Sequence, residues 1–174
     1  MDSIDRIAAD WEAQQLSPDR LDAFHVHGRI QHAARFYERL YERIATAHGM
    51  TAGDVYVLLA LRRSSSPLTP TELVREVSVT SGAMTKRLDR LERLHLVRRE
   101  PDPRDARSVK IALTAKGRRL VDEEISYATH AEIAAIGTLS SDERDALAAL
   151  LRKLLAALES APGAGVLEKG ALRR

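Results

Sequence analysis

Apolar residues recur along most of this 174-residue chain with the three- and four-residue spacing of amphipathic helices. The first segment with this pattern covers about residues 3–15. Its apolar positions share one face of the predicted helix: Ile4, Ile7, Ala8 and Trp11. Such a stripe has to pack on another element. Ser17 followed by Pro18 then supplies the cap and first-turn residues of a long second helix, which we expect to run to about His48.

Start signals place three further helices in the middle of the chain. Thr51 and Asp54 have the spacing of a capping box and predict a third helix, AGDVYVLLALRRS. Thr69 and Glu72 repeat that spacing, with a proline at the first helical position, and predict a fourth helix within LTPTELVREV. A fifth helix, SGAMTKRLDRLERLH, follows a three-residue break, and its apolar face carries Met84, Leu88, Leu91 and Leu94. Two short helices with a tight connection are typical of a helix-turn-helix.

A basic hairpin is predicted directly after the helix pair. The segments LVRRE (96–100) and SVKIALT (108–114) are typical of strands, and the turn between them contains two prolines that stiffen it. A helix-turn-helix followed by such a hairpin is a winged helix. The predicted fold class is therefore mainly α with a small β-hairpin wing: a winged helix-turn-helix with N- and C-terminal dimerisation helices.

Two more helices follow the hairpin, one from about Thr114 to Ile136 and one from a Ser140–Glu143 capping pair to about Leu158. The chain then divides into four predicted segments: an extra N-terminal helix and a long dimerisation helix at 1–48, a winged helix-turn-helix DNA-binding lobe at 51–113, C-terminal dimerisation helices at 114–158, and a flexible tail of linker composition at 159–174.

The terminal helices predict a homodimer, because they are too long and too apolar to be buried by one small lobe. The segment LAALLRKLLAAL leaves an apolar face without an internal partner. No run approaches the ~18 consecutive apolar residues of a membrane span, and the N-terminus MDSIDRIAAD is acidic where a signal peptide would be basic. We therefore expect a cytoplasmic protein with no membrane partner. The absence of cysteine excludes disulfides, thiolate metal sites and cysteine nucleophiles.

Charge is distributed unevenly along the chain. Residues 62–119 hold 15 Lys and Arg against 7 Asp and Glu, a surplus of eight positive charges, whereas the remainder holds 12 against 18. Clustered positive charge binds phosphates irrespective of sequence, so a basic middle between acidic ends suggests a polyanion-binding module on a scaffold. A solvated surface of mixed charge is the alternative. The helix pair and the hairpin favour double-stranded DNA.

The polar side of the fifth helix has the residue types that read a DNA groove. The expected DNA-reading residues there are Ser81, Gly82, Thr85, Lys86 and Arg93. The glycine lets the backbone approach the groove, the hydroxyls can bond bases or phosphates, and the cations can meet phosphate or guanine. Asp89 lies on the same side and fits it poorly because of its charge.

The wing turn supplies a second set of DNA-binding candidates. Arg104 and Arg107 are expected to project towards a narrow minor groove, which attracts guanidinium groups. Asp105 is expected to hydrogen-bond the backbone of the turn. An ordinary charged surface loop would have a similar sequence, and the neighbouring helix pair favours DNA.

With these elements in place, the chain resembles the MarR family of winged-helix transcription regulators over nearly its whole length. The resemblance rests on LTPTELVREVSVTSGAMTKRLDRLERLHLVRRE, on DAR within DPRDARSVKIALT, and on LTAKG at the entry to the next helix. It implies a homodimeric repressor that binds a pseudopalindromic operator and releases it when a small aromatic ligand binds.

Another group of residues suggests what the ligand is. Arg87 lies beside the apolar face of the fifth helix and away from its groove side, where an unpaired guanidinium is costly. Asp54 on the third helix is a candidate partner, Arg99 in the first wing strand is a second cation, and Trp11 is an aromatic lid. Such a site would favour a planar anionic heteroaromatic molecule.

In order and spacing these four residues resemble the signature of the urate-responsive subgroup of MarR regulators, which also carries an added N-terminal helix. The resemblance implies that urate or a related purine binds between the dimer arm and the DNA-binding lobe, and that disturbed charge contacts then shift the recognition helices. The structural alternatives are a core tryptophan, a helix cap, a salt-bridge partner and a phosphate contact. Phenolic or aromatic carboxylate ligands are the alternative effectors.

Other classes of protein find less support in the sequence. No nucleophile elbow, P-loop, dinucleotide-binding or zinc-protease motif occurs, so we expect neither an enzyme nor a cofactor. His25 and His27 do not share a helical face, and no clear carboxylate joins them or His32, so we expect no metal site. A DNA architectural protein without an effector would have the same wing and helix pair.

Overall fold

In the computed structural model, the described residues are 1–102 and 105–160, and the described side chains exclude those at positions 106, 107 and 124–129. The elements in chain order are α1 (Ser3–Ala13), α2 (Pro18–Ala47), α3 (Ala52–Arg63), α4 (Pro70–Val77), α5 (Ser81–Arg93), β1 (Val97–Asp102), β2 (Asp105–Leu113), α6 (Ala115–Leu120), a π-helical turn η1 (Val121–Ile125), α7 (Ser126–Ile136) and α8 (Ser141–Ser160).

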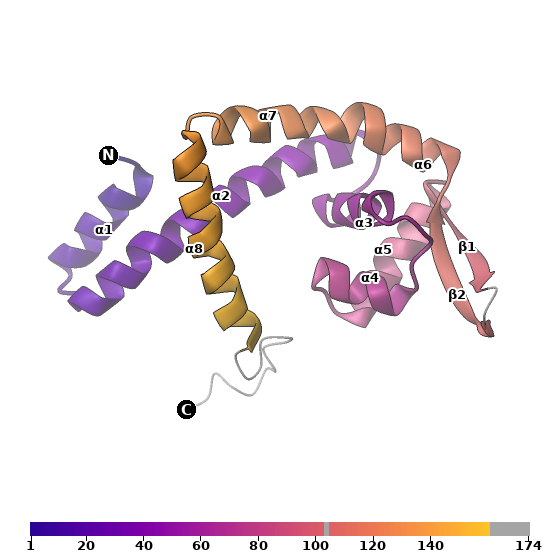
Figure 1. Ribbon diagram of the computed structural model, residues 1–174, viewed down its shortest axis with the longest axis horizontal. Coiled ribbons are helices and arrows are strands. Elements are labelled where there is room, and N and C mark those ends of the chain that lie inside the picture. Colours follow the sequence, from indigo (N-terminus) through magenta and orange to yellow (C-terminus); the bar gives the residue numbers. More distant parts are fainter. Residues whose placement is uncertain (103–104, 161–174) are drawn as a thin grey trace.

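An elongated helical arm carries a compact lobe at one end (Figure 1). The lobe contains α3, α4, α5 and the β1–β2 hairpin, whereas α1, most of α2, α7 and α8 form the arm. The expectation of a mainly helical chain with a two-stranded antiparallel wing is confirmed. The division into four segments remains a proposal, and most of the predicted tail, 161–174, lies outside the described residues.

The core of the lobe is built around α3. Val55 and Leu58 of this helix are completely buried, and helices and strands pack on it from several sides. Large side chains of α4, α5 and β2 are also fully buried: Leu73, Met84, Leu88, Leu91 and Ile111. The apolar face predicted for the fifth helix therefore faces this core.

Capping residues define the helix starts as the sequence predicts. Thr51 and Asp54 form a capping box at α3, and Thr69 and Glu72 form another at α4. Ser17 stands at the cap position of α2, but its side chain makes no capping hydrogen bond. A proline at the first helical position sets the helical φ there, so α2 begins without that bond.

The wing is longer than its sequence predicts. β1 continues through Pro101 to Asp102, and β2 starts at Asp105, so most of the predicted turn belongs to the strands. Antiparallel pairs run from Val97↔Leu113 to Pro101↔Val109, with a register shift before Asp102. Proline is tolerated at this position because a two-stranded sheet consists only of edge strands.

The helix predicted over residues 114–136 is divided by the π-helical turn η1. Wider turns of this kind are rare and local to long helices. Asp122 in this turn pairs with Arg62 at the end of α3, with 2.6 Å between Oδ1 and Nε. The Tyr41 hydroxyl of α2 donates a 2.6 Å hydrogen bond to Glu132 of α7. Burial and this bond both raise the pKa of Tyr41. The helical connection is thus fastened to the lobe and to the arm.

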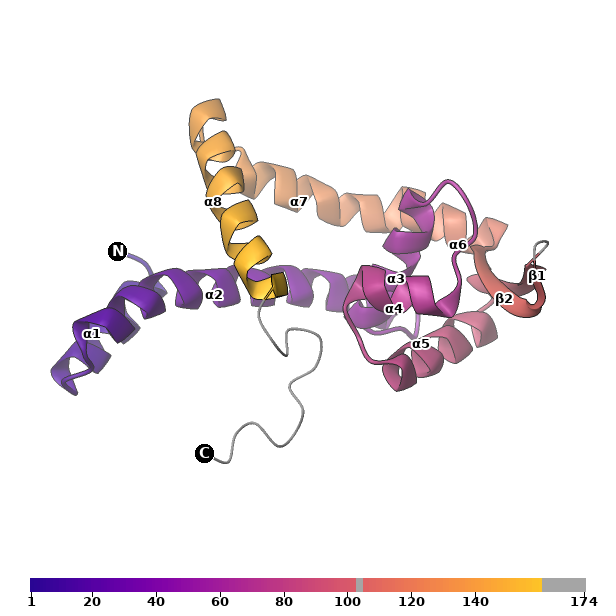
Figure 2. The ribbon, with the colours of Figure 1, turned by 60° about the horizontal axis from the view of Figure 1, so that its bottom comes forward.

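The C-terminal helix α8 turns sharply from the end of α7 (Figures 1 and 2) and packs little on the other described elements. None of its residues is buried. Its exposed leucines are Leu147, Leu150, Leu154, Leu155 and Leu158. In the part of the chain that the structure describes, no single helix has the length and apolar character to cross a membrane, and α2 and α3 meet those criteria only jointly, across a bend of 91°.

Gly117 allows α6 to pack directly against the start of the wing. A Cβ at this position would lie 2.0 Å from the carbonyl oxygen of Leu96. We predict that Gly117→Ala lowers the free energy of unfolding by about 1–3 kcal/mol or more, because a backbone atom would have to move. Urea denaturation of the purified variant measures this change.

Gly82 is the matched control because it is also a helical glycine, and a Cβ there would meet nothing within 4 Å. Gly82→Ala should leave stability unchanged or raise it by up to about 1 kcal/mol, through its better helix propensity. Equal effects of the two substitutions would contradict the close approach of α6.

Candidate nucleic-acid interface and effector site

The recognition helix α5 presents one buried and one exposed side, as the sequence predicts. Met84, Leu88 and Leu91 face the core. All five residues expected to read DNA are exposed: Ser81, Gly82, Thr85, Lys86 and Arg93. The N-terminal cap of the helix is Thr80, whose hydroxyl accepts a hydrogen bond from the backbone N–H of Ala83.

Asp89, the misfit on this exposed side, is neutralised by the wing. Arg99 of β1 donates from Nη2 to the Asp89 carboxylate, and its Nε lies 3.1 Å from Glu92. One guanidinium therefore compensates two carboxylates of the recognition helix. The sequence analysis did not predict this contact, because it depends on where β1 passes α5 in space. The i, i+3 spacing of the two acids was the available signal.

At the wing, Asp105 is exposed at the start of β2 and pairs in register with Asp102. Arg104 lies outside the described residues, as does the side chain of Arg107, whose backbone belongs to β2. Lys110 was not predicted as a functional residue. Its Nζ lies 3.6 Å from Asp102 and 3.5 Å from the Pro67 carbonyl oxygen, so it fastens the hairpin to the loop before α4.

Asp54 is a buried carboxylate at the junction of α3 and α5. Its side chain is fully inaccessible to solvent, and its Oδ2 accepts hydrogen bonds from the backbone N–H and the hydroxyl of Thr51. Its ion pair is with Arg90, with 2.7 Å between Nε and Oδ2. The expectation that Asp54 pairs with Arg87 is therefore corrected. Arg90 lies almost one turn further along α5, on the same flank, and reaches Asp54 instead.

Arg87 packs across the start of α3. A Cβ added to Gly53 would lie 2.6 Å from the guanidinium carbon of Arg87, so a larger residue there would displace the end of this side chain. Arg87 Nη1 is buried and makes no hydrogen bond with the described residues. This cation therefore has an unused donor, and its guanidinium lies against Gly53, the residue before Asp54 in α3.

Trp11 belongs to α1, which lies at the opposite end of the molecule from α3, α5 and β1, the elements of the other three candidate ligand residues (Figure 1). Ile4 and Ala8 of its helix are buried against α2, whereas Ile7 and Trp11 remain 40% and 47% exposed. The predicted apolar stripe of α1 is thus only half covered. Within one protomer, Trp11 does not meet Asp54, Arg87 or Arg99.

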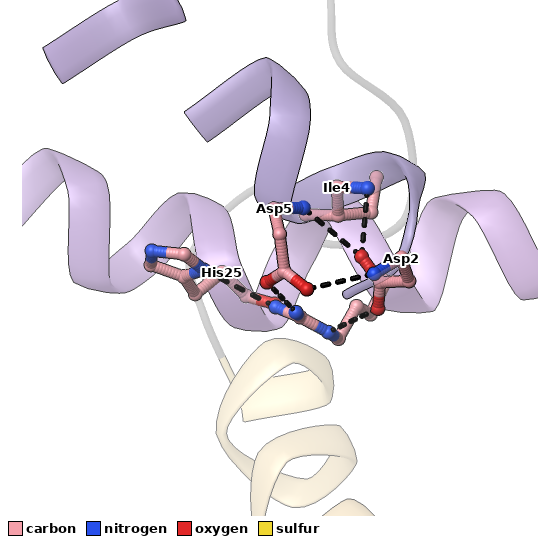
Figure 3. Close-up of polar contacts among 5 residues, drawn as sticks. Asp2, Ile4, Asp5 and His25 are labelled. Atoms are coloured by element: carbon pink, nitrogen blue, oxygen red, sulfur yellow. Dashed lines mark hydrogen bonds and ion pairs between the residues drawn. The ribbon is translucent and has the colours of Figure 1, made fainter. Parts of the chain in front are cut away.

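A charged network fixes α1 on α2 (Figure 3). Arg29 of α2 donates from Nε to Asp2 at 2.9 Å and from Nη2 to Asp5, and its Nη1 bonds the carbonyl oxygen of His25 at 2.8 Å. Asp2 also caps α1 through the backbone N–H groups of Ile4 and Asp5. These bonds, chiefly the one from the Asp5 backbone, lower the pKa of Asp2. Within the described residues no cluster of His, Asp or Glu forms a metal site.

Comparisons with known proteins are consistent with this geometry. A family model described as the MarR family matches residues 48–108. The chain is 26% identical over 153 residues to the HTH-type transcriptional regulator PecS of Dickeya dadantii, which covers 87% of this chain and 92% of that protein.

Two solved structures extend the comparison. A mutant of MarR from E. coli complexed with operator DNA is 32% identical, with a TM-score of 0.63, over 74% of this chain and 92% of that one. BpsR of Bordetella bronchiseptica, whose DNA binding is described as regulated by 6-hydroxynicotinic acid, is 27% identical, with a TM-score of 0.63, over 75% and 98%.

The Asp54–Arg90 pair makes a stability prediction. Arg90→Met should lower the free energy of unfolding by about 3 kcal/mol, because it leaves a buried carboxylate without its cation, although Thr51 still donates to it. Urea denaturation at neutral pH measures the loss. Arg93→Met, at an exposed position three residues further along α5, should change stability by less than about 0.5 kcal/mol. A stability loss below about 1 kcal/mol for Arg90→Met would show that the pair is not needed for folding.

Proposed function

This chain belongs to the MarR family of DNA-binding transcription regulators, and we propose that it is a repressor that holds a pseudopalindromic operator as a homodimer until a small aromatic anion binds. It is a transcription regulator and not an enzyme. The repressor role, the operator symmetry, the effector and the residues that contact each ligand are the proposed part.

The observation that carries the proposal is the exposed side of α5 next to the wing. Lys86 and Arg93 lie there beside hydroxyls and a glycine, while the opposite side of the helix is fixed in the core. We propose that α5 enters the major groove and that Arg104, Asp105 and Arg107 of the wing contact the flanking minor groove. The operator-bound MarR of E. coli, which shares this fold, supports that arrangement.

The apolar face of α8 supports the proposed homodimer. This helix has no buried residue and five exposed leucines, and leaving so much apolar surface in water costs free energy unless a second surface covers it. Two arms that pack together would place two recognition helices about 34 Å apart, one turn of duplex DNA. In this proposal 1–48 and 114–158 are the dimerisation segments and 51–113 is the DNA-binding lobe.

For the effector we propose a planar aromatic anion, with urate or a related purine as the first candidate. Arg87 offers an unused buried donor, and Arg99 is held by two carboxylates that an anion would displace. Because Trp11 lies on the far end of its own protomer, a shared site would need Trp11 of a second copy. The aromatic acid that regulates BpsR supports aromatic carboxylates as the second candidate class.

Arg99 offers a route from effector to DNA release in this proposal. An anion that pairs with Arg99 would separate it from Asp89 and Glu92, and two uncompensated carboxylates would then lie on the DNA-facing helix. Like charges opposite phosphates oppose binding. The effector would thus weaken operator binding without touching the DNA.

Operator binding tests the DNA-contact residues. Lys86→Gln and Arg107→Gln should each weaken binding to a duplex from the upstream region of the protein's own gene. Each should also lower the slope of log K against log salt by about one, because one phosphate contact is lost. Gel shifts or anisotropy titrations at several salt concentrations measure both effects.

Arg6→Gln is the control for that experiment, because it removes the same charge from the exposed surface of α1, far from α5 (Figure 1). Its salt slope should equal that of the wild type. An unchanged slope in both test variants would refute the assigned interface.

The neutralisation of Asp89 by Arg99 gives a rescue experiment. Arg99→Gln should weaken operator binding on the order of tenfold in the absence of effector, since a surface charge contact is worth about 1 kcal/mol or more. Adding Asp89→Asn should restore most of the affinity. If the double variant binds as weakly as Arg99→Gln, Arg99 acts by contacting DNA directly and the release route is wrong.

A further inference from the structure

We propose that Lys110 is a positioning residue for operator binding: it holds the outer half of the wing against the N-terminal end of α4, and the wing reaches the flanking minor groove only when it is held there. This inference deepens the proposed function and rests on the wing contact with DNA that is part of it. Lys110 acts through the residues of the wing and is not itself one of the residues proposed to contact DNA.

The side chain of Lys110 extends along the hairpin instead of pairing with the residue directly opposite. That residue is Glu100, whose carboxylate lies 3.1 Å from Nη2 of Arg98. The ammonium group of Lys110 lies 3.6 Å from Oδ2 of Asp102, a diagonal neighbour on the partner strand, and 3.5 Å from the carbonyl oxygen of Pro67. One cation thus connects the last residue of β1 to the loop before α4.

The pair of Lys110 with Asp102 is better shielded from water than the other ion pair on the hairpin. The side chains of Lys110 and Asp102 are 23% and 12% exposed, whereas those of Arg98 and Glu100 are 57% and 33% exposed. Charges that are partly withdrawn from water are screened less, and removing one partner leaves the other without compensation. The shielded pair is therefore the one that can fix the position of the hairpin.

A third charge, Glu72 in the first turn of α4, connects this pair to the helix-turn-helix. Its Oε2 accepts hydrogen bonds of 2.7 and 2.9 Å from the backbone N–H and the hydroxyl of Thr69. The bond from the Thr69 backbone is the main cause that lowers the pKa of Glu72. Lys110 lowers this pKa further, and Asp102 opposes it. Without Lys110, a carboxylate of the wing and a carboxylate of α4 would repel each other.

Backbone contacts hold only the inner half of the hairpin. Leu68 and Ile111 exchange two backbone hydrogen bonds, of 3.1 and 2.7 Å, and Ile111 is completely buried. Beyond Ile111 towards the tip, the described part of the hairpin makes no backbone hydrogen bond with the rest of the lobe. Side chains hold it there: Arg99 binds α5, and Lys110 binds the loop before α4. The hairpin end lies away from α6 (Figure 1).

A displacement of Asp102 moves the residues proposed for the minor groove. Asp102 is the last residue of β1 and pairs in register with Asp105, the first residue of β2. Hydrogen bonds to DNA require donor–acceptor distances of about 3 Å, so a shift of the hairpin end by about 1–2 Å would break them. The loss would be confined to the flanks of the operator, because α5 is held in the core by its own apolar side.

Two duplexes test the role of Lys110 on the full-length protein: one with the footprinted half-sites and their flanks, and one trimmed to the half-sites. Lys110→Met should weaken binding to the flanked duplex roughly tenfold, the equivalent of one or two charge-assisted hydrogen bonds, and leave binding to the trimmed duplex unchanged. Lys110→Arg keeps the charge and should bind both like the wild type. Urea denaturation checks that each variant is folded.

Asp102→Asn separates positioning from a direct contact of Lys110 with phosphate. It removes a negative charge from the wing, so long-range electrostatics alone would tighten binding to DNA. If Lys110 holds the wing through Asp102, the substitution should instead weaken binding to the flanked duplex. Asp10→Asn removes the same charge from the exposed surface of α1, far from the wing (Figure 1), and should bind like the wild type.

The outcomes keep this inference separate from the proposed function. If the wild type prefers the flanked duplex and Lys110→Met keeps that preference, the inference fails and the wing contact stands. An equal loss on both duplexes, or tighter binding by Asp102→Asn, would also overturn it, because Lys110 would then act on the whole lobe or on phosphate directly. A wild type that binds both duplexes equally, or neither, would refute the proposed wing contact and this inference with it.

Discussion

The buried carboxylate of Asp54 is the contact on which the geometry of the lobe depends. It caps the N-terminus of α3 by accepting a hydrogen bond from the backbone N–H of Thr51, and it also pairs with Arg90 of α5. A buried charge is tolerated only where such partners surround it, so the carboxylate fixes the position of α5 relative to α3. Because α3 forms the centre of the core, the side of α5 that faces solvent is determined by this junction.

The number of cations available to DNA depends on the ion pairs between elements more than on the count of basic residues. The surplus of eight positive charges in residues 62–119 includes cations that are already engaged. Arg90 is committed to Asp54, and Arg99 compensates Asp89 and Glu92. Lys86 and Arg93 remain exposed on α5. Two unpaired cations beside carboxylates that Arg99 neutralises thus give α5 a face that attracts DNA phosphates. If Arg99 left those carboxylates, their charge would repel the phosphates.

Local sequence signals predicted most of the fold, and spatial contacts explain what they missed. Capping boxes such as Thr51–Asp54 and Thr69–Glu72 depend on three-residue spacing, so the starts of α3 and α4 follow from sequence. The extension of β1 to Asp102 and the π-helical turn at Val121 depend on pairing with distant segments. Periodicity likewise placed Arg87 beside the apolar face of α5, but the cation that pairs with Asp54 is Arg90, which the sequence analysis did not single out. The predicted roles in DNA and effector binding stay predictions.

The added helix α1 gives the molecule a chemically distinct end. Its 30-residue neighbour α2 is about 45 Å long at 1.5 Å per residue, and α1 lies at the end of α2 that is far from the lobe (Figure 1). A displacement of α1 has to reach the lobe along this helix or through a second copy. The Tyr41–Glu132 bond and the Arg62–Asp122 pair link α2 and α3 to the α6–α7 connection. A shift of α2 would therefore act on the same connection that carries α8, and the arm and the lobe would respond together.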